Sequence, residues 1–401
     1  MAAEQPSALP IARTCPYAPR EEHVRLREEE PVSRVTLPTG TQAWAVTRHE
    51  DVRTLLADPR FSSDRSRPGF PMVEERSKQS ASVLPRMLVS MDPPEHGPAR
   101  RAVLGEFTVK RMNALRPRIQ EIVDEHVDAM LAGPRPVDLV RALSLPVPSL
   151  VICELLGVPY DDHEFFQSRS ASIVSHTASH EDQKTALVDL AVYLDGLLRA
   201  KEAEPGDDLL SRQIGRQREE KGSVDRHDLT GLAFLLLSAG HETTANMISL
   251  AVLQLARNPE AREALRRDPG GTPHAVEELL RYFTIAEQAV GRVAAEDVEL
   301  GGQLIRAGEG VLVLSHAANR DPRAFPDPDA FDAGRGARNH LAFGYGAHQC
   351  LGQNLARMEL QIVVDTLLRR LPGLEPAVPV DGLPFKDDAI VYGIHEFPVT
   401  W

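Results

Sequence analysis

The chain's longest hydrophobic stretch covers residues 228–257 and is apolar almost all the way round a helix. Such a segment is typical of a helix buried at the centre of a protein. Asp228 is a plausible N-cap, and about 29 residues would give a helix roughly 43 Å long. The middle of the segment reads SAGHETTAN, which argues against a membrane span. Polar residues in a buried helix tend to mark function, although a polar patch satisfied by neighbouring helices is the alternative.

Weaker periodicities predict further helices and a few strands. We expect helices at 98–132, 137–157 and 183–202, strands at 41–48 and within 297–315, a closing strand pair within 389–401 and a long loop at 62–90. Residues 1–20 are rich in Pro and Ala and are expected to wrap the surface. Because strands and helices do not alternate regularly, the pattern indicates a mainly α fold with minor β and disfavours a doubly wound sheet.

The overall charge narrows the choice of partners. The 45 Lys and Arg against 58 Asp and Glu give a net charge of 45 − 58 = −13. Nucleic acid and an anionic membrane both need a basic face on the protein, so neither is expected as the main partner. The first 30 residues hold no apolar segment, so we expect neither a standard export signal nor a membrane anchor.

The three cysteines, Cys15, Cys153 and Cys350, lie far apart in the sequence. Such a set disfavours a disulfide framework and favours a reducing compartment, so we expect a cytoplasmic protein. Their number excludes zinc or iron–sulfur sites that need four cysteines.

Cys350 lies in HLAFGYGAHQCLGQ, a glycine-rich loop at residues 340–353, and several chemistries can be eliminated for it. HETTA has Ala245 where a zinc protease needs its second His, and GYGAHQ has Gln349 in place of the third glycine of a dinucleotide fingerprint. The chain has no G-x-S-x-G elbow. A cysteine nucleophile with His348 as its base, and a free cysteine acting as a small apolar residue, stay open at this point.

The loop resembles one known motif over its whole length. Phe343-x-x-Gly346-x-His348-x-Cys350-x-Gly352 is similar to the haem-thiolate loop of cytochrome P-450 monooxygenases. The resemblance implies haem b with its iron bound by the thiolate of Cys350. The segment after Cys350 reads as a helix, whose N-terminal N–H groups and dipole would stabilise that thiolate. Gly346 and Gly352 would leave room for the macrocycle, and the expected haem contacts in the loop are Phe343, Gly344, His348 and Gly352.

Basic residues elsewhere match the family's partners for the haem propionates. DPPEHGPARR resembles the family's H-x-x-x-R and supplies His96 and Arg100. By the same resemblance AVGRVAAEDVEL supplies Arg292, and His348 of the loop is the fourth member. Propionates need cationic or hydrogen-bonding partners, and these four residues would provide them.

A buried ion network is expected beneath the loop. EELLRY places Glu278 and Arg281 three residues apart, on one face of a helix. Pairs with this spacing are often surface salt bridges, but the family has an E-x-x-R pair in this place with a later arginine as third member. Arg335 matches that third position, and the trio would be structural rather than catalytic.

The resemblance also explains the polar residues of the central helix. AGHETT is similar to the oxygen-activating turn of the family, in which Ala239 and Gly240 would leave room for dioxygen over the iron. Glu242 and Thr243 match the acid and alcohol that deliver protons in a dry site. We expect His241 to face elsewhere.

The resemblance runs from about residue 45 to 401 and implies a cytochrome P-450 fold, a triangular helical prism with a small sheet domain. We therefore expect one domain over 1–401. The matches to AGHETTAN, NRDP and the haem loop indicate the soluble actinobacterial type, which oxidises macrolides, statins, vitamin D-like sterols and xenobiotics. The reaction would insert one oxygen atom of O2 into a C–H bond of a bulky hydrophobic molecule. We expect a monomer.

Electrons must come from other proteins, because the chain has no flavin fingerprint and too few cysteines for an iron–sulfur cluster. We expect a separate ferredoxin and an NAD(P)H-dependent ferredoxin reductase. The cations proposed for docking an acidic ferredoxin are Lys110, Arg111, Arg116, Arg338 and Arg357. The residues expected to line the substrate pocket are Ile285, Ala289, Val290 and Val391.

Two other interpretations stay open on the sequence alone. The first is a haem-thiolate peroxygenase or nitric oxide reductase, against which the intact Glu242–Thr243 pair argues. The second is a non-catalytic haem-binding protein, which would bind haem without turning over a substrate.

Overall fold

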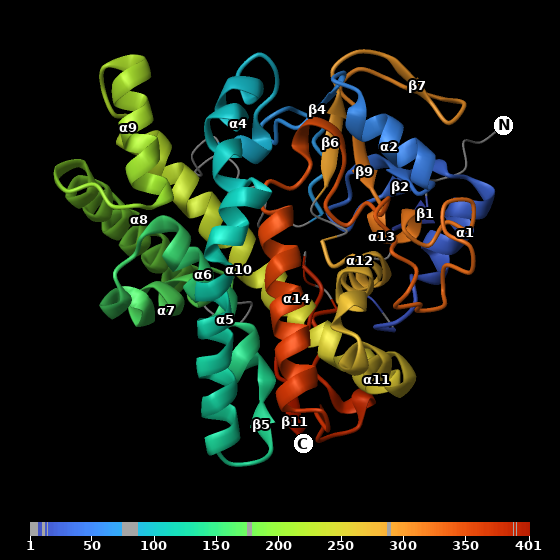
Figure 1. Cartoon of the computed structure of the whole chain (residues 1–401). Coiled ribbons are helices and arrows are strands. Elements are labelled where there is room, and N and C mark those ends of the chain that lie inside the picture. The colour runs from blue at the N-terminus through green and yellow to red at the C-terminus, as the bar shows by residue number, and fades with distance from the viewer. Residues whose placement is uncertain are drawn as a thin grey trace.

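A long helix, α10 (Arg226–Arg257), crosses the middle of the computed structural model (Figure 1). The structure describes residues 7–9, 13, 15–73, 87–174, 179–286, 290–387, 389 and 391–401. Every residue of α10 from Thr244 to Leu255 is buried, as the hydrophobic pattern predicts. The predicted N-cap is wrong, because the side chain of Asp225 accepts the N–H of Asp228 and the helix therefore begins earlier.

Other helices surround α10. Among the α-helices, the largest contacts with it are made by α6 (Pro146–Leu156), α8 (His180–Ala203), α12 (Thr272–Phe283) and α14 (Gln353–Arg370), which bury its apolar surface. Further helices are α1 (Glu21–Glu29), α2 (His49–Ala57), α4 (His96–Leu104), α5 (Val109–Ala132), α7 (His163–Val174), α9 (Leu209–Lys221), α11 (Pro259–Arg267) and α13 (Ser315–Ala318). The mainly α fold with minor β is therefore confirmed.

Two of the predicted helices have wrong boundaries. The helix expected at 98–132 is two helices, α4 and α5, separated by a 3₁₀ turn at Gly105–Phe107 and by extended backbone at Thr108. The helix expected at 137–157 begins only at Pro146, a residue that suits the first turn of a helix because it needs no N–H partner there. The preceding residues form β5 (Val137–Asp138) and a π turn (Val140–Ser144).

The main sheet lies beside the helices, at the upper right of Figure 1. Within the described residues its order is β1-β2-β3-β9-β6-β4. The strands are β1 (Ser7–Ala8), β2 (Val32–Thr36), β3 (Gln42–Val46), β4 (Phe61–Ser62), β6 (Gly291–Ala294) and β9 (Gly310–Val313). The predicted strands at 41–48 and within 297–315 are thus present as β3, the pair β7 (Val298–Leu300) and β8 (Gln303–Ile305), and β9.

Both ends of the chain differ from the expectation. β11 (Pro398–Thr400) pairs with β10 (Glu375–Pro376) and β5 instead of with the residues just before it. At the N-terminus, β1 extends the main sheet and the buried guanidinium of Arg13 donates to the carbonyls of Phe283 and Thr284. The described part of residues 1–20 is therefore built into the fold. The expectation of one domain stays a prediction, and so does the loop at 62–90 where residues 74–86 lie outside the described part.

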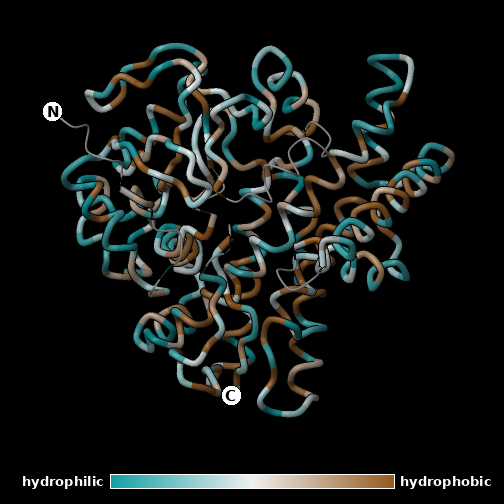
Figure 2. Tube along the Cα trace, turned by 180° about the vertical axis from the view of Figure 1, so that it is seen from behind, coloured by the Kyte–Doolittle hydropathy of each residue, from teal (hydrophilic) through white to brown (hydrophobic). Residues whose placement is uncertain are grey.

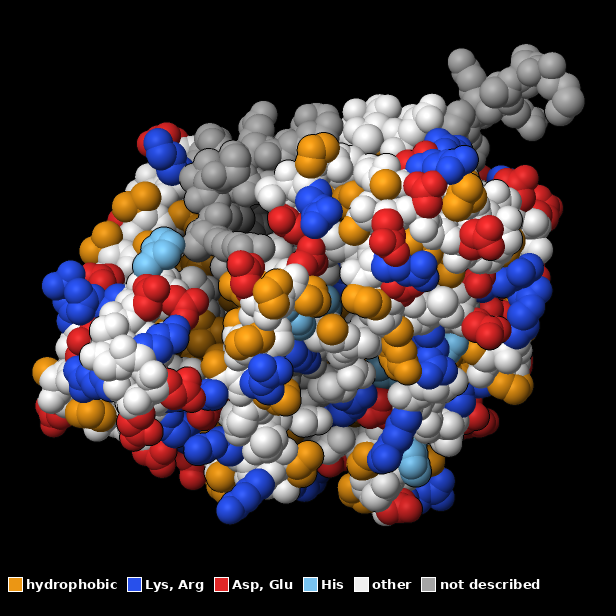
Figure 3. All heavy atoms as spheres, turned by 90° about the horizontal axis from the view of Figure 1, so that it is seen from above, with side chains coloured by type: hydrophobic (Ala, Val, Ile, Leu, Met, Phe, Trp, Pro, Cys, Tyr) orange, Lys and Arg blue, Asp and Glu red, His pale blue; other side chains and the backbone are white. Residues whose placement is uncertain are grey.

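The surface agrees with the charge pattern. Hydrophilic residues dominate the outer loops, and hydrophobic residues dominate the segments between them (Figure 2). On the face in Figure 3 acidic and basic side chains are intermixed. Among the described residues no helix is long and apolar enough to cross a membrane.

Candidate haem-binding site

The loop that contains Cys350 is held in shape by its own backbone. The N–H of Cys350 donates to the carbonyl of Phe343 over 2.8 Å and closes the loop. Gly344 and Gly346 have φ angles of +68° and +71°, which favour glycine. α14 begins three residues after Cys350, so the cysteine precedes the helix and does not belong to it.

Gly346 lies where the loop passes against α2. A Cβ at this position would lie 2.4 Å from the backbone oxygen of Leu56, at the end of α2. This contact is a sufficient reason for a glycine, and the expectation that Gly346 leaves room for a macrocycle stays a prediction. At Gly352 a Cβ would meet nothing within 4 Å among the described residues, and that expectation stays a prediction.

The side chain of Cys350 is half-buried. Burial raises its pKa, while the backbone N–H of Gly352 and the positive charges of Arg100 and Arg357 act in the opposite direction. Donors and cations that favour a thiolate are therefore already aimed at this sulfur. A bound cation would complete the stabilisation of the negative charge.

The ion network expected beneath the loop is present. Glu278 and Arg281 of α12 are both 0% exposed and form a bidentate pair at 2.7 and 2.8 Å. Arg335 donates to the same carboxylate at 3.1 Å. Arg281 also donates to the carbonyl of Asn319, whose side-chain oxygen accepts the N–H of Leu341 at 2.7 Å. The network thereby connects α12 to the start of the loop.

A second network at the loop was not expected from the sequence. Arg357 of α14 makes a bidentate pair with Glu277 at 2.6 and 3.0 Å, and its guanidinium lies 4.5 Å from the ring centroid of Phe343. His340 contacts the same carboxylate at 3.1 Å. Arg357 thus supports the loop, and the expectation that it also docks a ferredoxin stays a prediction. The two adjacent glutamates at the start of EELLRY could have indicated this second network, because Glu277 joins one network and Glu278 the other.

The four residues expected at the propionates lie close together. The rings of His96 and His348 are stacked with centroids 4.0 Å apart, and Arg100 donates to the backbone oxygen of Gln349 beside them. Burial lowers the pKa of Arg292 to about 10, and burial with the positive charges of His96 and Arg292 lowers that of His348 to about 3. Basic groups crowded in this way favour an anion between them.

The oxygen-activating turn lies on the accessible side of α10. Ala239, Glu242 and Thr243 are exposed or half-buried, whereas His241 is buried towards Leu145, as expected. The hydroxyl of Thr243 donates to the carbonyl of Ala239 at 2.7 Å. Glu242 is paired with Lys386 at 2.9 Å, a contact that the sequence did not reveal.

Gly240 also has a packing role. A Cβ at Gly240 would lie 2.7 Å from Cδ1 of Ile152 in α6. The space that this glycine leaves is therefore used by the packing of α10 on α6, and the expectation that it leaves room for dioxygen stays a prediction.

The expected pocket residues are only partly described. Ala289 lies outside the described residues. Ile285 is buried, and its carbonyl accepts the N–H of Tyr392 at 2.9 Å, which brings Val391 to the end of α12. Val290 is half-buried against the core of the main sheet.

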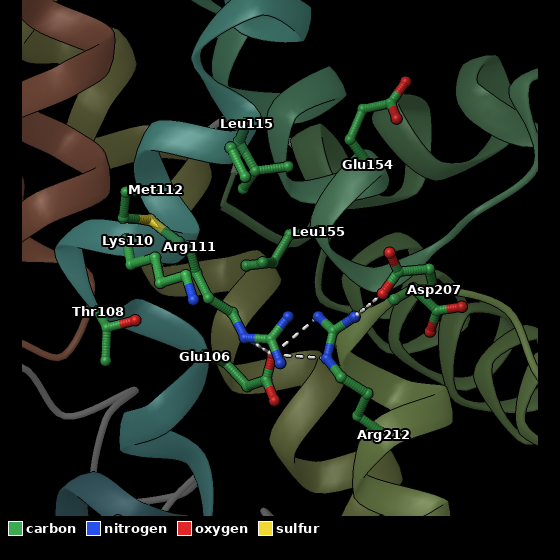
Figure 4. Close-up of a pocket in the computed structure, with 12 residues that line it drawn as sticks. Glu106, Thr108, Lys110, Arg111, Met112, Leu115, Glu154, Leu155, Asp207 and Arg212 are labelled. Carbon is green, nitrogen blue, oxygen red and sulfur yellow. Dashed lines mark hydrogen bonds and ion pairs between the residues drawn. The ribbon is translucent and has the colours of Figure 1, made fainter.

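A cavity of about 500 Å³ lies elsewhere, between α5, α6 and the start of α9 (Figure 4). None of the residues predicted to bind haem or substrate lines it, although the proposed docking cations Lys110 and Arg111 do. Arg111 and Arg212 point at Glu106, and Arg212 also pairs with Asp207 at 2.6 Å. Because these charges neutralise one another, the cavity does not compete with the Cys350 loop as the functional site.

Comparisons with known proteins agree with the geometry of the Cys350 site. The cytochrome P450 family model matches residues 199–269 and 272–377. Vitamin D3 dihydroxylase of Streptomyces griseolus is 50% identical over 395 residues, 98% of this chain and 97% of that protein. Pentalenic acid synthase of Streptomyces avermitilis is 50% identical over 396 residues, 99% of this chain and 98% of that protein. The crystal structure of cytochrome P450 MoxA from Nonomuraea recticatena has a TM-score of 0.95 and 59% identity, and 98% of each chain is covered.

The fold and the site define a haem-thiolate monooxygenase. The chain belongs to the cytochrome P450 family, and its relatives place it in the actinobacterial type. The residues present fit the haem that the family carries: the thiol of Cys350 faces donors and cations, and the Nε2 atom of buried His96 has no hydrogen-bond partner within the described part of the chain. The peroxygenase, nitric oxide reductase and non-catalytic alternatives are not favoured.

Proposed function

We propose that the chain hydroxylates a bulky hydrophobic small molecule, with Cys350 as the iron ligand and His96, Arg100, Arg292 and His348 as the propionate partners. The observation that supports the proposal best is the crowding of these four basic side chains beside the Cys350 loop. The overall reaction is RH + O2 + 2 electrons + 2 protons → ROH + H2O. The haem, when bound, supplies the oxygen activation and the insertion into the C–H bond.

With haem bound, Phe343 would shield the sulfur of Cys350 from water, and Gly344 and Gly352 would let the backbone of the loop approach the cofactor. Ala239 on α10 would leave space for dioxygen. The trio of Glu278, Arg281 and Arg335 holds the loop in place through its hydrogen bonds to the residues before it.

Thr243 and Glu242 have different roles in proton delivery. The hydroxyl hydrogen of Thr243 is already donated to Ala239, so its oxygen is left to accept a hydrogen bond from a ligand. Glu242, the next residue, takes protons from water and passes them on as a general acid. A half-buried carboxylate suits this role because it can exchange protons with water while bulk water stays outside the site.

The substrate belongs to the class of bulky hydrophobic metabolites. Two relatives are named for vitamin D3 and for pentalenic acid, which supports a sterol- or terpene-like molecule more than a small polar one. Polyketides, macrolides and statins share the same bulk and hydrophobic character. Ile285, Val290 and Val391, with Ala289, would line the pocket by apolar contact.

The electrons come from a ferredoxin and an NAD(P)H-dependent reductase, which fits a monomer in the cytoplasm. Three cysteines, all unpaired, are consistent with that reducing compartment. The cations proposed for docking are the exposed Lys110, Arg111, Arg116 and Arg338, together with the half-buried Arg357.

An optical titration of the purified ferric protein tests the proposal. Macrolides, statin acids, sterols and flavonoids are added in turn, and loss of the iron's water ligand shifts the haem spectrum when a compound lies over the iron. We expect at least one sterol or macrolide to give the shift, and Cys350→Ser to lose the thiolate spectrum. A thiolate spectrum that persists in Cys350→Ser would contradict the ligand assignment. The absence of any shift across the panel would contradict the substrate class.

A further inference from the structure

Lys386 makes the one ion pair that is found for Glu242 within the described part of the chain. Its Nζ donates to Oε1 of Glu242 at 2.9 Å, and the two residues are 144 positions apart. The side chains of Lys386 and Glu242 are only 11% and 14% exposed, so water and salt screen the pair weakly. The pair is therefore a fixed part of the structure, unlike a mobile surface contact.

The backbone around Lys386 is anchored to the same helix. The N–H of Lys386 donates to the carbonyl of Gly393 at 2.9 Å, beside the antiparallel bridge between Phe385 and Ile394. A Cβ at Gly393 would lie 2.1 Å from Oδ1 of Asn246, one turn after Glu242 on α10. The chain near its C-terminus thus packs on the face of α10 that carries Glu242.

Within the described part of the chain, Lys386 is the residue that fixes the carboxylate of Glu242 in place. The hydroxyl of Thr243, the next residue, already donates to Ala239 and gives Glu242 no hydrogen bond. The ammonium of Lys386 is what holds one carboxylate oxygen, which leaves the other for exchange with water.

We propose that Lys386 is a positioning residue for proton delivery: it fixes the carboxylate of Glu242 beside Thr243. The inference rests on the proposed role of Glu242. No bond to Lys386 forms or breaks, because each proton passes from water through Glu242 and not through the lysine.

The chain offers a matched control for the structural effect of losing a buried lysine. Lys201 pairs with Asp208 at 2.7 Å, with side chains 9% and 7% exposed. This pair involves none of the residues proposed to act on protons or haem. Lys201→Met removes a comparable ion pair from the helical part of the fold.

The experiment compares Lys386→Met, Lys386→Arg, Glu242→Gln and Lys201→Met as holoenzymes. For Lys386→Met we expect about a tenfold fall in product formed per electron from NAD(P)H, because a misplaced acid loses part of its effect. Peroxide-driven turnover and the substrate-induced spectral shift stay within about twofold, since neither needs protons from Glu242. Lys386→Arg restores most of the yield. A double-mutant cycle of Glu242→Gln and Lys386→Met is measured by denaturant unfolding. We expect the two side chains to be coupled by about tenfold in the folding equilibrium constant.

Three results overturn the inference. The first is an equal fall of NAD(P)H-driven and peroxide-driven turnover in Lys386→Met, and the second is the same loss of yield in Lys201→Met. The third is an unchanged yield in Lys386→Met while Glu242→Gln is impaired, which removes the role of Lys386 alone. A full yield in Glu242→Gln would instead remove the proposed role of Glu242, and the inference with it.

Discussion

Ile152 occupies the space that Gly240 leaves in the central helix. A Cβ on Gly240 would lie 2.7 Å from Cδ1 and 3.2 Å from Cγ1 of Ile152. The small residue of the AGHETT motif is thus tied to helix packing, next to two residues that we assign to proton delivery. The need for a glycine at position 240 therefore becomes clear only from its contact with Ile152.

The first prediction follows from this contact. Gly240→Ala forces Ile152 to move in a packed interface and should lower the free energy of unfolding by about 1–3 kcal/mol. Ile152→Val removes Cδ1 and costs about 0.5–1.5 kcal/mol alone. The double variant should lose less than the sum of the two, as measured by denaturant unfolding. Strictly additive losses would show that Gly240 is needed for something other than Ile152.

The stacked imidazoles of His96 and His348 give the second prediction. Replacing either one by Phe keeps the stacking but removes the N–H donor, and a lost hydrogen bond to a charged group costs about 1.5–3 kcal/mol. We expect haem to leave each variant at least about tenfold faster, as followed by transfer to a globin acceptor. His126→Phe is the control, because its ring bonds the carbonyl of Ile122 within α5, far along the chain from the Cys350 loop. Equal haem loss in the control would refute the assignment.

The buried pair of Glu278 and Arg281 gives the third prediction. Glu278→Gln leaves the guanidinium of Arg281 without its counter-charge at 0% exposure, which costs about 3–5 kcal/mol. Unfolding should shift accordingly, and the protein should incorporate less haem because the loop loses its support. Glu263→Gln breaks a pair of the same spacing, with Arg266, that is 46–47% exposed, and its effect should be much smaller. Similar effects for the two variants would contradict a buried network.

These residues show how far the sequence alone could go. Glu278, Arg281 and Arg335 were predicted correctly as a network because a helical spacing and a family motif point to the same carboxylate. The pair between Glu242 and Lys386 could not be predicted, since no periodicity links residues 144 positions apart. The boundary between α4 and α5 was missed because hydrophobic residues continue on both sides of Gly105, and only the turn there separates them. The long-range ion pair and the helix boundary both depend on tertiary contacts, and a local sequence pattern carries no information about such contacts.

The last prediction concerns acid pH and the network under Phe343. Burial opposes ionisation of Glu277, but hydrogen bonds from His340 and Arg357 outweigh it and lower the pKa from 4.5 to about 2. A carboxylate with a lowered pKa stabilises the fold above its unfolded value, and this contribution is lost as the pH falls from about 4.5 towards 2. With allowance for screening by water, the loss is about 2 kcal/mol. Glu277→Gln should flatten the dependence of the denaturant midpoint on pH between 6 and 3, and Arg357→Gln should move the loss to higher pH. If Glu277→Gln keeps the full acid sensitivity of the parent protein, other carboxylates are responsible for it.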